Sequence, residues 1–182
     1  MLNQIQPARP SGQASEDAVD LLIGCHLRIR HFTAAAVKLA HAQGATDDEI
    51  RQAAAAVYRY YSVSLPLHEA DEEDTVRPRL NPVAGERVRH ALLAMADQHQ
   101  GIYDFVERLM PLLQLLERNP GSLSQVGGEM CSLTSALDEI FRAHLQMEEE
   151  VIFPAIQALL PQTTRDDMFR EMQARRKQGA SG

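Results

Sequence analysis

Two stretches of the chain repeat one pattern of histidine, glutamate and proline. The first reads HEADEEDTVRPRL from His68, and the second reads HLQMEEEVIFPAI from His144, 76 residues later (144 − 68). In both, glutamate stands at the fourth and fifth places after the histidine and proline at the tenth. Imidazole and carboxylate together suit iron, manganese, zinc or cobalt. The repeat therefore suggests a metal site built twice from the same parts.

Helical phase separates the two glutamates of each pair. A helix turns by about 100° per residue, so Glu72 lies about 40° from His68 and Glu73 about 140° from it. The glutamates that follow His144 hold the same positions. We therefore expect Glu72 and Glu148 to face the metal and the fifth-place glutamates to point away. Apolar residues flank both pairs, and an unpaired buried carboxylate is very costly. This disfavours the alternative of two ordinary surface His-Glu pairs.

Two lone histidines extend the repeat to whole helical hairpins. His26 precedes His68 by 42 residues, and His99 precedes His144 by 45. If the hairpins pack with pseudo-twofold symmetry, four imidazoles and two carboxylates converge at the middle of the bundle. The predicted metal ligands are His26, His68, Glu72, His99, His144 and Glu148. The residues expected to lie outside the ligand set are His31, His41, His90, Cys25 and Cys131.

Composition, together with capping and helix-breaking residues, predicts the helices that position these groups. Alanine, leucine, glutamate and arginine are abundant and tryptophan is absent, which favours helices over strands. Four long helices are expected at about 15–43, 46–77, 86–117 and 122–160, and a short fifth at about 165–178. The expected N-caps are Ser15 or Asp17, Thr46 with Glu49 and Ser122 with Gln125 as capping boxes, and Thr164. Gly44 is expected to end the first helix, and Pro66 to bend the second.

Short connections between long helices predict an all-α, up-down antiparallel four-helix bundle. In this reading residues 1–14 form a flexible N-terminal lead, residues 15–162 the bundle, and residues 163–182 a short C-terminal helix and tail. The net charge of −7 argues against nucleic-acid binding. No apolar run is long enough to span a membrane, and no signal peptide or disulfide framework is evident. We therefore expect a cytoplasmic protein.

The chain resembles the hemerythrin-like family of HHE cation-binding domains. The resemblance rests on His26, on the His68 and Glu72 motif, on His99, and on the His144 and Glu148 motif. It covers about residues 15–160. It implies a non-haem di-iron centre inside a four-helix bundle.

Six ligands exceed what one tetrahedral zinc ion takes, and they suit two ions bridged by the glutamates. Two divalent ions bring four positive charges and two carboxylates cancel two, which favours a bridging hydroxide or oxide. Zinc or manganese in place of Fe²⁺/Fe³⁺ stays an alternative. An open coordination position would admit oxygen, nitric oxide or peroxide.

The pattern departs from that of the oxygen-carrying members, which have a further histidine one turn from the third-helix ligand. Here Tyr103 follows His99 at that spacing, so we expect one ion to be more open and simple reversible oxygen carriage to be disfavoured. Tyr103, and less so Tyr61, could hydrogen-bond a bound ligand or could only pack. The expected function is to bind or react with a diatomic ligand in sensing, carriage or stress response. The alternatives are a redox enzyme that reduces peroxide or nitric oxide or donates iron for iron–sulfur repair, and an iron store. The oligomeric state and the physiological ligand are left open.

Overall fold

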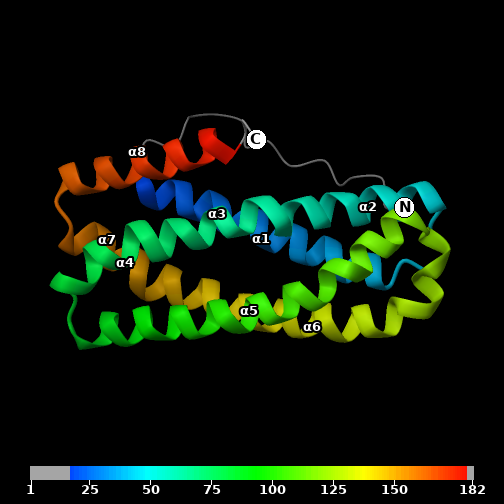
Figure 1. The fold of residues 1–182 in the computed structure, drawn as a ribbon. Coiled ribbons are helices and arrows are strands. Elements are labelled where there is room, and N and C mark those ends of the chain that lie inside the picture. Colours follow the sequence, from blue (N-terminus) through cyan, green and yellow to red (C-terminus); the bar gives the residue numbers. More distant parts are fainter. Residues whose placement is uncertain (1–16, 180–182) are drawn as a thin grey trace.

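Four helical rods run antiparallel and form a bundle, and a fifth helix lies along its outside (Figure 1). The computed structural model describes residues 17–179, so the expected flexible lead at 1–14 and Ser15 fall outside the described residues. The rods are α1 (Ala18–Ala40); α2 (Asp47–Arg59), α3 (Leu65–Ala70) and α4 (Arg77–Leu80) in line; α5 (Glu86–Arg118); and α6 (Leu123–Met147) with α7 (Phe153–Leu159). Helix α8 (Gln162–Gly179) follows. The predicted all-α bundle with a short C-terminal helix is confirmed. No helix within 17–179 is long and apolar enough to cross a membrane.

Three π-helical turns keep two of the rods continuous across prolines. They are η1 (Tyr60–Ser64), η2 (Asp71–Val76) and η5 (Glu148–Ile152), and they precede Pro66, Pro78 and Pro154. A proline removes one backbone donor and clashes with the carbonyl four residues earlier. In each case that carbonyl lies inside the π turn, where the wider ring of an i→i+5 bond relieves the clash. The second rod therefore continues through Pro78 to Leu80, beyond the predicted end at residue 77.

Two of the predicted N-caps, Asp17 and Thr46, are confirmed, and two, Ser122 and Thr164, are wrong. The side chain of Asp17 accepts a hydrogen bond from the Val19 N–H at 2.7 Å, and Thr46 forms the predicted capping box. The capping box predicted at Ser122 is wrong. An N-cap needs an extended backbone, whereas Ser122 has φ −68° and ψ −8° and no capping hydrogen bond. The 3-10 turn η4 (Pro120–Ser122) leads directly into α6 instead.

Two predicted helix boundaries were also misplaced by three residues. Helix α1 ends at Ala40 rather than Gln43, and Gly44 adopts φ +79° within the turn that follows. Helix α8 begins at Gln162, immediately after Pro161, so Thr164 lies inside its first turn instead of capping it. The 3-10 turn η3 (Asn81–Val83) makes the connection before α5.

The apolar core is divided into two clusters by a buried polar layer. Along α1, Leu22 belongs to one cluster and Ile29 to the other. Along α5, Met95 and Ile102 are divided in the same way. His26 and His99 lie between these apolar neighbours, and both are buried. The bundle therefore carries polar groups at mid-length, where a core would ordinarily be continuous.

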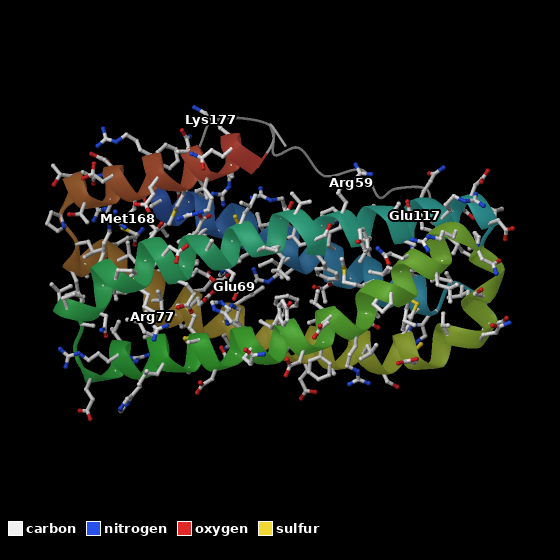
Figure 2. The ribbon with its side chains drawn as sticks, viewed as in Figure 1. Arg59, Glu69, Arg77, Glu117, Met168 and Lys177 are labelled. Atoms are coloured by element: carbon white, nitrogen blue, oxygen red, sulfur yellow. The ribbon has the colours of Figure 1, made fainter. Side chains whose placement is uncertain are left out.

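Helix α8 packs against one end of the bundle through two methionines. Met168 and Met172 are fully buried and belong to the same apolar cluster as Leu22 of α1. Figure 2 shows Met168 on the side of α8 that faces the other helices. Their burial indicates that α8 is part of the folded unit rather than an appended tail.

Replacing Met168 by alanine should lower the free energy of unfolding by about 3 kcal/mol, because a buried methionine truncated in a packed core leaves a cavity. Urea unfolding followed by circular dichroism measures the change. Glu107→Ala, at an exposed site on α5, is the matched control and should change stability by less than about 0.5 kcal/mol. Equal stability of Met168→Ala and the wild type would show that α8 does not stabilise the bundle.

Candidate metal centre

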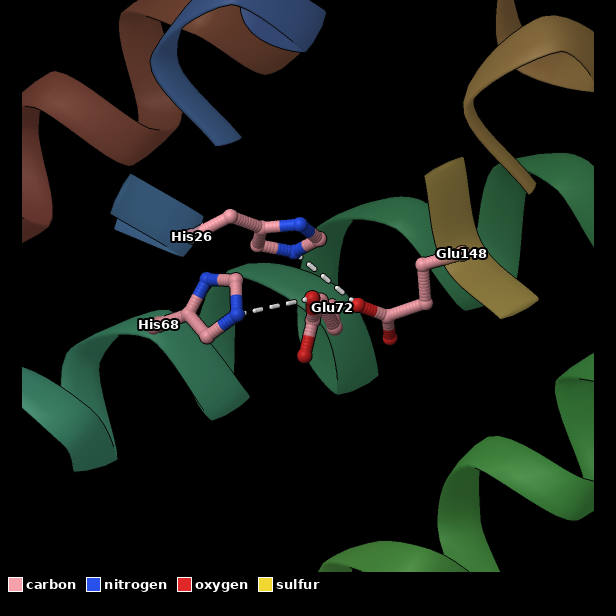
Figure 3. A group of neighbouring side chains, drawn as sticks. All are labelled: His26, His68, Glu72 and Glu148. Atoms are coloured by element: carbon pink, nitrogen blue, oxygen red, sulfur yellow. Dashed lines mark ion pairs between the residues drawn. The ribbon is translucent and has the colours of Figure 1, made fainter. Parts of the chain in front are cut away.

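All four rods contribute to one buried group of histidines and glutamates. His26 comes from α1, His68 from α3 and Glu72 from η2, His99 from α5, and His144 and Glu148 from α6 and η5. The structure thus brings together all six residues predicted as ligands, and none is more than 8% exposed. We call these six residues the cage. Figure 3 shows four of them, with His26 directed at Glu148 and His68 directed at Glu72.

Each glutamate of the cage lies between two histidines. Glu72 places one oxygen 3.1 Å from His68 Nε2 and the other 3.0 Å from His99 Nε2. Glu148 places one oxygen 3.0 Å from His26 Nε2 and the other 3.3 Å from His144 Nε2. Two sets of donors result, each with two imidazoles and one oxygen from each glutamate.

These two sets coincide with two groups that could hold a metal ion. One comprises His26, His68, Glu72 and Glu148, and the other Glu72, His99, His144 and Glu148; within each group the ligand atoms lie within 4.8 Å of one another. Both sets contain two histidines. Each set therefore offers four protein donors, and the expectation that one ion is more open stays a prediction.

The donor atoms of the cage fit a metal better than they fit one another. His26 Nε2, His68 Nε2, Glu72 Oε1 and both Glu148 oxygens are buried without a hydrogen bond, although histidine nitrogens lie about 3 Å away. Ligand atoms about 2.1 Å from one ion and at right angles to each other are about 3.0 Å apart. The exception is His99 Nε2, which is hydrogen-bonded to Glu72 Oε2 at 3.0 Å. The spacing and the other missing hydrogen bonds are those of side chains arranged around ions.

Burial strongly perturbs the glutamates of the cage. Loss of solvent, together with the nearby Glu72 carboxylate, raises the pKa of Glu148 to about 8. Burial likewise raises the pKa of Glu72 well above its ordinary value, and Asp71 and Glu73 add to the effect. Without a cation, the pair therefore holds at least one proton at neutral pH. Bound metal ions would remove the cost of ionising them.

The histidines are perturbed in the opposite sense. Burial lowers the pKa of His68 and of His144 well below the usual value, and the neighbouring imidazoles lower it further. Both side chains are therefore neutral at physiological pH. A neutral imidazole nitrogen is the form that coordinates a metal.

The fifth-place glutamates, expected to point away, instead contact the histidines of the cage. Glu149 Oε1 lies 2.8 Å from His26 Nδ1, and Glu73 Oε1 lies 3.1 Å from His99 Nδ1. Each histidine thus donates from Nδ1 to a carboxylate and directs Nε2 into the cage. Such a carboxylate fixes the tautomer and orientation of a metal-binding imidazole. The expectation that these glutamates point away is wrong, although neither belongs to the two groups that could hold an ion.

An arginine holds each of these two glutamates in place. Arg30 donates to both oxygens of Glu149 at 2.9 Å, and Arg77 donates to Glu73 at 2.6 Å. The Arg30 guanidinium holds the pKa of Glu149 below its usual value. Glu149 is therefore ionised at neutral pH and accepts the His26 proton as a carboxylate.

The π turns explain why helical phase misplaced these glutamates. Glu72 and Glu73 lie in η2, and Glu148 and Glu149 in η5. A π turn contains more residues than an α turn, so consecutive side chains are separated by a smaller angle than 100°. Both glutamates of a pair then fit on the inner half of the rod. The proline at the tenth place was the available sequence signal for this distortion.

The remaining two histidines of the cage differ in their outer contacts. His144 Nδ1 is 3.0 Å from the Gln98 side-chain oxygen. His68 Nδ1 is buried without a hydrogen bond. The pseudo-symmetric counterpart of Gln98 is Cys25 (98 − 73), whose sulfur accepts from Arg28 and Arg176 instead. The two halves therefore match in their inner donors and differ in what surrounds them.

Helix α8 contacts a buried aspartate that stands next to a glutamate of the cage. Asp71, next to Glu72, is fully buried and accepts hydrogen bonds from Arg175 and Arg176 at 2.5 Å each. Thr75 of η2 and Arg79 of α4 donate hydrogen bonds to Glu171 of α8. These contacts cover the η2 side of the cage. Sequence reasoning missed them, because nothing in the local pattern pairs residues about 100 positions apart.

The two tyrosines predicted to lie near the ligands take different positions. Tyr61 is buried, and its hydroxyl lies 3.3 Å from the Thr33 hydroxyl. Tyr103 is 57% exposed and lines a surface recess beside His99. A hydrogen bond from either to a bound ligand stays a prediction. The two groups within 17–179 that could hold a metal ion include none of His31, His41, His90, Cys25 and Cys131.

Comparison with known protein families gives a match that covers most of the chain. The model of the family described as Hemerythrin, the hemerythrin HHE cation binding domain, matches residues 17–156. The match contains all six residues of the cage and ends before α8. No curated protein matches the chain significantly.

Three consecutive glutamates should respond differently to replacement by alanine. Glu148→Ala should remove most of the bound metal, because it deletes one donor from both sets. Glu149→Ala should weaken binding by about 10- to 100-fold, because it releases the His26 ring. Glu150→Ala, at an exposed position, is the control and should bind as the wild type does. Competition with a chelator measures the affinities. Equal affinities for the Glu149 and Glu150 variants would exclude an orienting role for Glu149.

Metal uptake at pH 7 should release at least one proton per chain. In the metal-free protein the Glu148 carboxyl is protonated at that pH, because its pKa is raised to about 8, and it must ionise in order to coordinate. Apparent affinity should therefore rise between pH 6 and pH 8. Calorimetric titration in buffers of different ionisation enthalpy counts the protons. Identical heats in phosphate and Tris buffers would contradict the expectation.

Proposed function

Because the chain belongs to the hemerythrin family of HHE cation-binding domains, we propose that the cage holds two iron ions and that the protein binds or reacts with a small diatomic ligand, oxygen or nitric oxide. The observation that carries this proposal is the pair of matched donor sets that share both glutamates. A lone ion in either set would leave the two inward-facing imidazole nitrogens of the other set without an ion.

The charges of the cage also favour two ions and a small bridge. Two divalent ions bring four positive charges, and the glutamates supply two negative ones. Burial of the remaining charge favours a bridging hydroxide or oxide. With four protein donors in each set, ions that prefer six ligands keep open positions. Manganese has similar preferences, whereas zinc is satisfied by four donors, so the identity of the metal decides the chemistry.

Iron bound in this way would supply a one-electron redox couple and open positions for a diatomic ligand. The chain's own residues would set the conditions. His68 and His144 would coordinate as neutral imidazoles, while Glu73 and Glu149 fix the rings of His99 and His26. The two apolar clusters on either side of the cage exclude bulk water. Such a site suits sensing, carriage or a stress response, and the alternative is a redox enzyme acting on peroxide or nitric oxide.

Metal analysis and an optical spectrum of the aerobically purified protein test this proposal. We expect about two irons per chain and a near-ultraviolet absorption from an oxo bridge. Zinc alone, or no metal after anaerobic iron loading, would refute it. Stopped-flow mixing of the reduced protein with oxygen then separates the two roles. A lasting spectral change supports carriage or sensing, and rapid oxidation without one supports the redox enzyme.

A further inference from the structure

The two halves of the cage have matching donors but unequal access to solvent. His99 is 8% exposed, whereas His26, His68 and His144 are 0%, 2% and 1% exposed. His99 also forms part of the wall of a recess of about 350 Å³ between α3–η2 and α5. The recess is lined by Glu69, Glu73, Ala96, His99, Gln100 and Tyr103. Figure 2 labels Glu69, which lies between the rods of α3 and α5. One imidazole of the cage is therefore reached from the surface.

The equivalent position in the other hairpin is closed by an arginine. The 73-residue offset that relates His26 to His99 also relates Arg30 to Tyr103. The Arg30 guanidinium donates two hydrogen bonds to Glu149, which in turn holds His26. Tyr103 is 57% exposed, and it makes no corresponding hydrogen bond to Glu73 within the described part of the chain. The two hairpins therefore differ at this pair of positions, and the difference leaves His99 less covered than His26.

Helix α8 covers the cage on the side of η2. Arg176 bridges the Cys25 sulfur and the Asp71 carboxylate, and Arg175 also binds Asp71. A smaller hollow of about 170 Å³ lies beside Arg176. Its lining residues, Cys25, Arg28, Tyr60, Ser64, Leu67 and Arg176, include no residue of the cage. The recess beside His99 is therefore the better candidate for a route inward.

The lining of the recess carries one negative charge, on Glu69, that no other described residue pairs with. Glu73 is paired with Arg77 and His99. Glu69 is half-buried and forms no ion pair with any of residues 17–179. A concave site lined by one sign of charge attracts the opposite sign and repels its own. Divalent cations and uncharged molecules would pass more readily than anions.

We propose that this recess is the access route to the cage, that it leads to the His99 and His144 half, and that it selects divalent cations and uncharged diatomic molecules over anions. The proposal rests on the proposed metal centre and adds the path and the charge selection. It also assigns the reactive position to the half that contains His99, the most accessible histidine of the cage.

Filling the recess tests the route in the metal-free protein. Ala96→Leu places a larger side chain in the lining and leaves every residue of the cage intact. Stopped-flow absorption should show Co²⁺ uptake about tenfold slower than in the wild type, with the final stoichiometry unchanged. Ile23→Phe is the matched control, because residue 23 is the pseudo-symmetric counterpart of residue 96 (96 − 73) and lies on the closed side. Its uptake rate should equal that of the wild type.

A second variant closes the recess from its exposed edge. Tyr103→Arg copies the arrangement at Arg30 and changes an exposed residue, so folding is preserved even if Ala96→Leu disturbs the packing. It too should slow Co²⁺ uptake. If the wild type takes up no Co²⁺, the metal centre itself is refuted. If the wild type fills, and both variants fill as fast as Ile23→Phe, the access route alone is refuted.

Glu69→Gln tests the charge selection on the iron-loaded protein. Removing this charge should raise the association rate of azide several-fold at low ionic strength and leave that of nitric oxide within about twofold. The azide effect should shrink in 1 M salt, where the screening length is about 3 Å. Equal changes for azide and nitric oxide would overturn the selection by charge.

Discussion

Two glutamates buried side by side at the middle of the bundle are the constraint on which the structure depends. Glu72 and Glu148 are almost completely inaccessible, and each lies between two imidazoles. A helical bundle of this size gains stability from apolar burial, and a polar layer that divides its core sacrifices part of that gain. The layer makes physical sense when cations neutralise the carboxylates and use the imidazole nitrogens that have no hydrogen bond.

The surroundings of the cage fix its geometry across the helices. Glu149 of η5 holds His26 of α1, and Glu73 of η2 holds His99 of α5. Each contact joins two rods, so the orientation of an imidazole depends on how the helices pack. The π turns serve the same purpose, because they let both glutamates of a pair reach inward without breaking the rod. A carboxylate that supports a ligand is then as much a part of the site as the ligand itself.

Helix α8 lies beyond the residues matched by the family model, yet it contacts the residue next to a cage glutamate. Asp71 would be a buried and uncompensated carboxylate without Arg175 and Arg176, and its pKa remains raised by burial even with both guanidinium groups in place. The helix therefore links the stability of one end of the bundle to the covering of the cage. It also contributes to the unequal access of two halves that are otherwise alike.

The sequence alone determined the bundle and the six residues of the cage. Helical spacing places a histidine and the fourth residue after it on one face, and the repeat of the whole hairpin sets the pseudo-twofold partner of each. The sequence also contained the Thr46 capping box, because that motif is local. It gave no means of placing Glu73 and Glu149, since the phase argument assumes a regular α-helix and both lie in π turns.

Tertiary structure alone decided everything that depends on the contacts between rods. It assigned two histidines to each half of the cage, joined α8 to Asp71, and bound Arg30 to the glutamate that holds His26 while leaving Tyr103 exposed beside His99. The pairs Glu72–His99, Asp71–Arg175 and Arg30–Glu149 lie 27, 104 and 119 positions apart in the sequence, and their geometry is set by how the helices cross. Local spacing therefore identifies the donors, whereas the packing of the rods decides which donors meet and which of them a small molecule can reach.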